Sequence, residues 1–165
     1  METLRQAQGK LETIRHSLAH ILAYAVQDLW PAAKFGIGPA VENGFYYDFD
    51  FPFPISESDL LKIEKKMREL LRQNITFERK EITKDKADIL FKNQPYKLEL
   101  IKDTENGPLY VYRSGEFTDL CKGPHIDSTK EIPFDGFKLT KLAGAYWRGS
   151  EKNKMLTRIY GVAFT

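Results

Sequence analysis

A long segment near the N-terminus constrains the fold most strongly, because its apolar residues recur with the period of a single helix face. Residues 11–30 place apolar side chains at the i, i+3, i+4 and i+7 spacing of an amphipathic helix. These side chains are Leu11, Ile14, Leu18, Ile21, Leu22, Ala25 and Leu29. At about 100° per residue, His16 and His20 project from the opposite side. We therefore expect a long helix that packs by its apolar stripe and holds both histidines away from the core.

The rest of the chain alternates helical and strand-like patterns. Residues 36–50 predict a hairpin that turns at Asn43-Gly44, and Ser56 with Asp59 opens a second helix that ends near residue 74. The later elements are a strand at 75–82, a short helix at 84–92, a brief element at 96–101, and strands at 109–113, 117–120, 137–142, 145–148 and 156–164. This order predicts an α+β fold, with a largely antiparallel sheet packed by two long helices.

Composition limits the classes of protein. The 165 residues are 42% hydrophobic and suffice for one substantial core, so residues 1–165 are expected to form one domain. The single cysteine excludes an internal disulfide, and no apolar run approaches the roughly 20 residues needed to cross a bilayer. We therefore expect a cytoplasmic protein without a membrane partner. The net charge of +2 gives no strong signature of nucleic-acid binding and leaves a local basic patch open.

The three histidines and the only cysteine form two matching pairs, His16-x-x-x-His20 and Cys121-x-x-x-His125. In the second pair, Gly123-Pro124 turns the chain so that both side chains converge. By ligand type and number, the four residues form a candidate tetrahedral zinc shell. The alternative is a pair of solvated helix histidines with a buried, inert cysteine.

Other site chemistry is missing from the sequence. It contains no P-loop, no dinucleotide fingerprint and no nucleophile-elbow serine, so nothing local supports ATP use, hydride transfer or a serine hydrolase. The segment between His16 and His20 holds no glutamate to act as a base, which argues against a zinc metalloprotease helix.

Five ordered blocks carry a family resemblance. They are Ile14-Arg-His-Ser-Leu-Ala-His20, Gly38-Pro39 with Asn43-Gly-Phe-Tyr-Tyr-Asp48, Asp119-Leu-Cys-Lys-Gly-Pro-His125, Lys138-Leu-Thr-Lys-Leu-Ala-Gly-Ala-Tyr-Trp-Arg-Gly149 and Lys154-Met-Leu-Thr-Arg-Ile-Tyr-Gly161. Over nearly the whole chain they resemble the editing domain of bacterial-type threonyl-tRNA synthetases. The related editing domains of alanyl-tRNA synthetases share the two His/Cys pairs, but the second and fourth blocks point to the threonine branch.

The resemblance implies hydrolysis of the ester that joins mischarged serine to the 3′-terminal adenosine of threonine tRNA. Serine lacks one methyl group of threonine, so a charging pocket rejects it by only about 1–3 kcal/mol of lost apolar contact. A second site that admits serine and clashes with the threonine methyl supplies the missing discrimination.

The resemblance also implies residue roles. His16 is expected to be the base that activates water, within a catalytic group completed by His20, Cys121 and His125. Lys97 matches a lysine that helps to protonate the leaving group through water, although the sequence pattern alone favours an exposed surface lysine.

The resemblance suggests substrate contacts as well. Asp119 would anchor the seryl ammonium or hydroxyl, and Tyr47 or the backbone of Gly38-Pro39 would form the wall that a threonine methyl strikes. Each residue also has a plain structural alternative, because Asp119 can cap the following turn and Tyr47 can be ordinary strand packing.

Metal use separates the branches. The resemblance implies that editing needs no metal; if zinc binds, its ligands are expected to be His16, His20, Cys121 and His125. Two alternatives therefore stay open: a zinc-dependent deacylase of another mischarged tRNA, such as alanyl-tRNA, and a non-catalytic, zinc-stabilised tRNA-binding module. A covalent role for Cys121 as nucleophile ranks last.

The resemblance does not extend to the charging or anticodon-binding domains of the synthetases. We therefore expect no ligase activity from this chain alone, and an excised fragment rather than a free-standing editing enzyme. The expected partners are the 3′ end of threonine tRNA, carrying seryl-adenosine, and the remaining synthetase domains.

Overall fold

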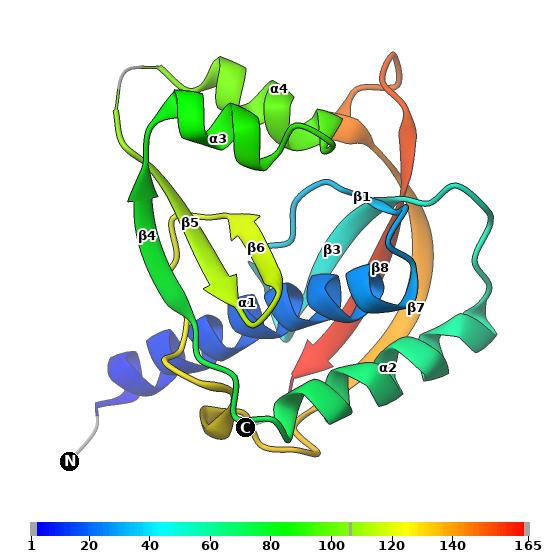
Figure 1. Ribbon diagram of the computed structural model, residues 1–165. Helices are drawn as coiled ribbons and strands as arrows, with labels where there is room; N and C mark the ends of the chain where they lie inside the picture. Colours follow the sequence, from blue (N-terminus) through cyan, green and yellow to red (C-terminus); the bar gives the residue numbers. More distant parts are fainter. Residues whose placement is uncertain (1–2, 106, 164–165) are drawn as a thin grey trace.

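The larger of two sheets is antiparallel and carries one wall of the candidate site. The structure, a computed structural model, describes residues 3–105 and 107–163 (Figure 1). The strands of the larger sheet are β1 (Lys34–Phe35), β2 (Ala40–Val41), β3 (Gly44–Asp50), β7 (Phe137–Tyr146) and β8 (Met155–Ala163). They are ordered β1-β3-β8-β7, and β2 pairs with the start of β3. The central strands β3 and β8 therefore hold the sheet together.

The predicted hairpin is confirmed. Strands β2 and β3 pair with Val41 opposite Gly44, and Asn43 takes the left-handed conformation (φ 64°) that asparagine tolerates in tight turns. Along β3, Phe45 and Tyr47 are buried toward the helices, whereas Tyr46 between them lies on the other face of the sheet and is half-buried. This alternation directs Tyr47 into the interior.

A separate three-stranded sheet carries the other wall. It has the order β4 (Glu78–Ile82), β5 (Leu109–Ser114), β6 (Phe117–Leu120), all antiparallel. Helices α3 (Lys84–Leu90) and α4 (Pro95–Asp103) cover it around a small core. That core contains Ile82, Ala87, Phe91, Ile101, Leu109 and Val111. The expected α+β class is confirmed, but the strands divide between two sheets.

Helix α1 (Leu4–Leu29) lies between the two sheets. Its two sides differ less in burial than the sequence pattern predicts. Ala19, Ala23 and His20 all lie on the side opposite the apolar stripe, and all three are buried. The expectation that His20 stays outside the core is therefore wrong. The cause is a second layer: β6 packs on α1, with Phe117 of β6 against the His20 ring.

Helix α2 (Glu57–Leu71) begins as predicted. Ser56 and Asp59 form a reciprocal capping box at its N-terminus, and Leu60, Ile63 and Met67 are buried on one side. The helix packs on α1 and on β7, so both long helices cover the same face of the larger sheet (Figure 1).

Several element boundaries differ from the predictions: α1 begins at Leu4 rather than at residue 11, and α2 ends at Leu71 rather than near residue 74. The strand expected at 75–82 pairs regularly only from Glu78, and the brief element at 96–101 is helix α4. The strands expected at 137–142 and 145–148 are one long strand, β7, because β8 pairs continuously past Ala143 and Gly144. Short 3-10 turns occur at Thr129–Glu131 and Trp147–Gly149. Among the helices of the described residues, none is long and apolar enough to span a bilayer.

Candidate active site

Three elements bring a buried charged triangle together. Lys97 comes from α4, Asp119 from β6 and Tyr47 from β3. The ammonium Nζ of Lys97 lies 2.7 Å from Oδ1 of Asp119 and donates to the Tyr47 hydroxyl at 3.1 Å. That hydroxyl donates to Oδ2 of Asp119 at 2.7 Å. Lys97 and Asp119 are only 2% and 6% exposed, so each charge depends on the other for its burial.

The hydrogen bonds of the triangle leave little capacity unused. Asp119 also accepts the N–H of Leu120 at Oδ1 (2.9 Å), so three of its roughly four acceptor positions are taken. The Tyr47 hydroxyl both donates and accepts, and burial raises its pKa well above the usual value. Within residues 3–105 and 107–163, Lys97 makes two hydrogen bonds and so keeps one N–H for a molecule in the cavity.

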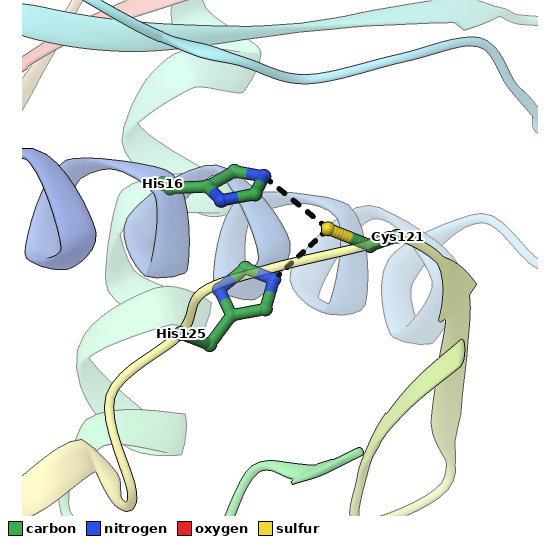
Figure 2. Close-up of side chains that lie close together, drawn as sticks. All are labelled: His16, Cys121 and His125. Atoms are coloured by element: carbon green, nitrogen blue, oxygen red, sulfur yellow. Dashed lines mark hydrogen bonds between the residues drawn. The ribbon is translucent and has the colours of Figure 1, made fainter. Parts of the chain in front are cut away.

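A second group, the His/Cys cluster, consists of His16, Cys121 and His125 (Figure 2). His16 projects from α1, while Cys121 and His125 lie on the segment after β6. Sγ of Cys121 lies 3.4 Å from Nε2 of His16 and 3.5 Å from Nε2 of His125. The turn at Gly123 (φ 82°) lets the last two side chains converge, as the sequence predicts.

The other ring nitrogens of the cluster face outward to fixed partners. Nδ1 of His16 lies 3.2 Å from the carbonyl oxygen of Pro124, and Nδ1 of His125 lies 3.0 Å from Oγ of Ser17. The two rings stack with their centroids 4.3 Å apart. The orientation of both imidazoles is therefore set from outside the cavity.

Burial keeps the cluster uncharged near neutral pH. It lowers the pKa of His16, an effect that the contact with Pro124 and the charge of Asp119 partly oppose. Desolvation lowers the pKa of His125 to about 2 and raises the pKa of the Cys121 thiol to about 11. Neutral imidazoles are able to accept protons, whereas a protonated thiol is a poor nucleophile.

His20, the fourth predicted member, does not join the cluster. It is 3% exposed and packs against the rings of Phe77, Phe117 and His125. Among the described residues, neither of its ring nitrogens has a hydrogen-bond partner. Desolvation lowers its pKa to about 4.

The predicted site residues line one cavity of about 200 Å³. Its walls contain His16, His20, Gly38, Pro39, Tyr47, Lys97, Asp119, Cys121 and His125, together with Ile37 and Leu120. A Cβ added at Gly38 would overlap the ring of Tyr47, so the backbone at this glycine lies directly on that ring. A larger hollow of about 600 Å³ adjoins the cavity and shares His16 and Pro39 with it.

The cluster has the ligand types and the nitrogen–sulfur spacing to hold a zinc ion through three residues. For Zn–N near 2.1 Å, Zn–S near 2.3 Å and tetrahedral angles, a nitrogen and a sulfur ligand lie roughly 3.6 Å apart. The observed separations of 3.4 and 3.5 Å agree with that value. His20 is not in the group whose ligand atoms lie within 4.8 Å of one another, so the spacing supports three of the four predicted ligands.

Sequence reasoning missed Ser17, which is fully buried and contacts His125. It stands inside the block that contains His16 and His20, but a serine between two histidines gives no signal of its own. Its contact with a residue 108 positions away appears only in the folded chain.

Comparison with known proteins agrees with the resemblance. Residues 109–160 match the model of the threonyl and alanyl tRNA synthetase second additional domain. Threonine–tRNA ligases of Dehalococcoides mccartyi, Borrelia hermsii and Thermotoga petrophila are 53%, 55% and 54% identical over 93%, 89% and 93% of this chain. The chain spans about a quarter of the length of these relatives (26%, 25% and 24%). Over most of its length this chain is therefore similar to about a quarter of a threonine–tRNA ligase, and residues 109–160 within it match the second additional domain.

Proposed function

We propose that this chain hydrolyses the ester of serine mischarged onto threonine tRNA, in the manner of an editing domain. One observation carries the proposal: a neutral imidazole, His16, and a buried ammonium, Lys97, line the same small cavity. An ester is hydrolysed by such a pair when one group withdraws a proton from water and the other stabilises developing negative charge.

His16 serves as the base. Its Nδ1 is committed to the Pro124 carbonyl, which can only accept, so Nδ1 carries the proton and Nε2 holds a free lone pair. That lone pair accepts a proton from water as the water oxygen adds to the ester carbonyl. Because burial lowers the pKa of His16, the ring is unprotonated at neutral pH and ready to act.

Lys97 and Asp119 form the polar wall of the cavity. The remaining N–H of Lys97 faces the oxyanion, or a water that returns the proton to the departing ribose oxygen. The remaining acceptor position of Asp119 binds the seryl ammonium or hydroxyl. The tetrahedral intermediate then collapses to free serine and a tRNA with an intact terminal hydroxyl.

Tyr47 and Gly38-Pro39 exclude threonine. The Tyr47 ring is held at both ends, by its hydroxyl bond to Asp119 and by aromatic contacts with Phe35 and Phe49. Gly38 lies against the ring face, so the wall has no room to retreat by the width of a methyl group. The adjoining hollow next to His16 accommodates the terminal adenosine of the tRNA.

The test is deacylation of serine-charged and threonine-charged threonine tRNA by the chain, with and without a strong chelator. We expect faster loss of serine in both conditions. His16→Ala should abolish hydrolysis while tRNA affinity, measured by filter binding, stays the same. If the His16→Ala variant hydrolyses seryl-tRNA at the wild-type rate, His16 is not the base. If the wild-type chain binds tRNA without hydrolysing the ester, the binding-module alternative holds.

The zinc-dependent alternative rests on the spacing within the His/Cys cluster, which matches a three-ligand shell. Bound there, zinc would be held by His16, Cys121 and His125 and would supply Lewis acidity. Activity lost on chelation and restored by zinc would favour this alternative over the metal-free scheme.

A further inference from the structure

Ser17 is a fully buried hydroxyl at the centre of α1, and all of its bonding capacity is used. Its Oγ lies 2.8 Å from the carbonyl oxygen of Thr13, 3.1 Å from the N–H of Ile126 and 3.0 Å from Nδ1 of His125. Two of these partners belong to the segment that carries the His/Cys cluster. The hydroxyl thus connects the helix of His16 to the loop of His125.

Counting protons assigns a direction to each contact. A hydroxyl has one proton and two acceptor lone pairs. The proton goes to the carbonyl of Thr13, which cannot donate, and one lone pair accepts the N–H of Ile126. The remaining lone pair faces His125, so Nδ1 of His125 must carry the ring proton and donate it to Ser17.

The same count leaves an excess of acceptors at the sulfur. With Nδ1 protonated in both rings, the Nε2 atoms of His16 and His125 both present lone pairs to Cys121. The thiol has one proton and can satisfy only one of them. The N–H of Gly123 donates to the sulfur at 3.3 Å and supplies nothing to either ring.

We propose that Ser17 is a positioning residue that holds His125 in the Nδ1–H form, so that Nε2 of His125 is able to accept a hydrogen bond from the Cys121 thiol and Nε2 of His16, not being the thiol's sole acceptor, is available to water. The last step rests on the proposed function; the assignment of the His125 tautomer does not. Ser17 does not line the cavity and acts only through His125.

Removing the Ser17 hydroxyl should leave Nε2 of His16 as the only acceptor for the Cys121 thiol within the cluster. Without Ser17 Oγ, Nδ1 of His125 loses its acceptor among the described residues, and the ring gains by carrying its proton on Nε2 and donating it to Cys121. The thiol proton then turns to His16 and occupies the lone pair that should receive the proton of water.

Nitrogen-15 NMR of the imidazoles tests the tautomer directly, because protonated and unprotonated ring nitrogens resonate in separate ranges. The chain has three histidines, so their signals are assigned by replacing each with glutamine. Spectra are recorded in chelator at about pH 8, where a histidine with pKa near 6.5 is neutral. We expect His125 to be protonated on Nδ1 in the wild type; protonation on Nε2 would overturn the proposal.

Variants separate positioning from folding. Ser17→Ala should move the His125 proton to Nε2, wholly or in part, whereas Ser17→Thr keeps the hydroxyl and should keep Nδ1–H. Ser114→Ala is the matched control, because Ser114 is equally buried and its hydroxyl has no partner among residues 3–105 and 107–163. An unchanged His125 pattern in Ser17→Ala refutes the role of the hydroxyl.

Deacylation gives the functional readout. Ser17→Ala should slow hydrolysis of seryl-tRNA about 10- to 100-fold, part of the roughly 10²- to 10⁴-fold that a positioned base contributes. KM should stay within about twofold, since Ser17 does not contact the cavity. Full activity in Ser17→Ala would refute the link to His16 while leaving the editing proposal intact. An inactive wild type would refute the editing proposal, and the NMR result would still decide the tautomer.

Discussion

His20 offers the sharpest test of the site's energetics, because it is a polar residue buried without compensation. Replacing it with leucine removes two ring nitrogens that have no partner among the described residues and keeps a side chain that packs on Phe77 and Phe117. An unsatisfied buried polar group costs about 1–3 kcal/mol. We therefore expect His20→Leu to raise the free energy of unfolding by about 1–3 kcal/mol at pH 7.

The same replacement should also change the pH dependence of stability. Burial lowers the pKa of His20 from 6.5 to about 4, so between these values the unfolded chain holds a proton that the folded chain does not. Stability from the neutral ring is complete above pH 6.5 and is lost as the pH falls toward 4. This pKa shift corresponds to about 3 kcal/mol in the free energy of unfolding, which changes by up to roughly 1.4 kcal/mol per pH unit.

Urea unfolding at a series of pH values, followed by tryptophan fluorescence in chelator, measures both effects. The wild type should lose about 3 kcal/mol more than His20→Leu between pH 6.5 and pH 4. His20→Gln is the matched control, because its amide is polar but does not titrate; it should share the flatter pH profile without the gain at pH 7. Parallel profiles for the wild type and both variants would refute the reasoning.

Three further perturbations test the remaining parts of the site. Lys97→Met should lower the free energy of unfolding by about 3–5 kcal/mol by leaving Asp119 buried without its cation. Lys154→Met removes an exposed lysine from its ion pair with Asp50 and should cost less than about 1 kcal/mol; equal losses in urea unfolding would contradict this. Gly38→Ala should destabilise the chain by about 1–3 kcal/mol because its methyl overlaps the Tyr47 ring, so an unchanged Tm would show that the wall yields. Excess zinc should slow seryl-tRNA hydrolysis by occupying lone pairs of the His/Cys cluster, and a chelator should not; a requirement for zinc would favour the alternative mechanism.

The sequence pattern predicted correctly those structural features that depend on residues close together in the sequence. The spacing of apolar residues in α1, the Asn43-Gly44 turn and the capping box at Ser56 all depend on contacts within a few positions, and the structure confirms them. The convergence of Cys121 on His125 is of the same kind, because a turn at Gly123 is enough to produce it.

The sequence pattern did not predict which side chains are buried by segments distant in the sequence. Ala19 and His20 lie on the side of α1 that the sequence marks as polar, yet both are buried, and Phe117 of β6 packs against His20. By pattern alone Lys97 is a surface lysine, and its burial depends on Asp119, which is 22 positions away on another element. A period of 3.6 residues shows which side of a helix is apolar, but not whether a second layer covers the other side.

The two sides of the cavity differ in how completely their polar groups are hydrogen-bonded. This difference suggests that one side contacts the substrate and the other acts on water. On one side, Lys97, Asp119 and Tyr47 bond to one another, which fixes their positions and suits a wall that measures the substrate. On the other side, the tautomers inferred above give the His/Cys cluster two Nε2 lone pairs and one thiol proton, so one acceptor has no donor among the described residues. A single donor at the position of His16 would remove that deficit. In the proposed mechanism, this unsatisfied lone pair is the place where a water molecule gives up a proton.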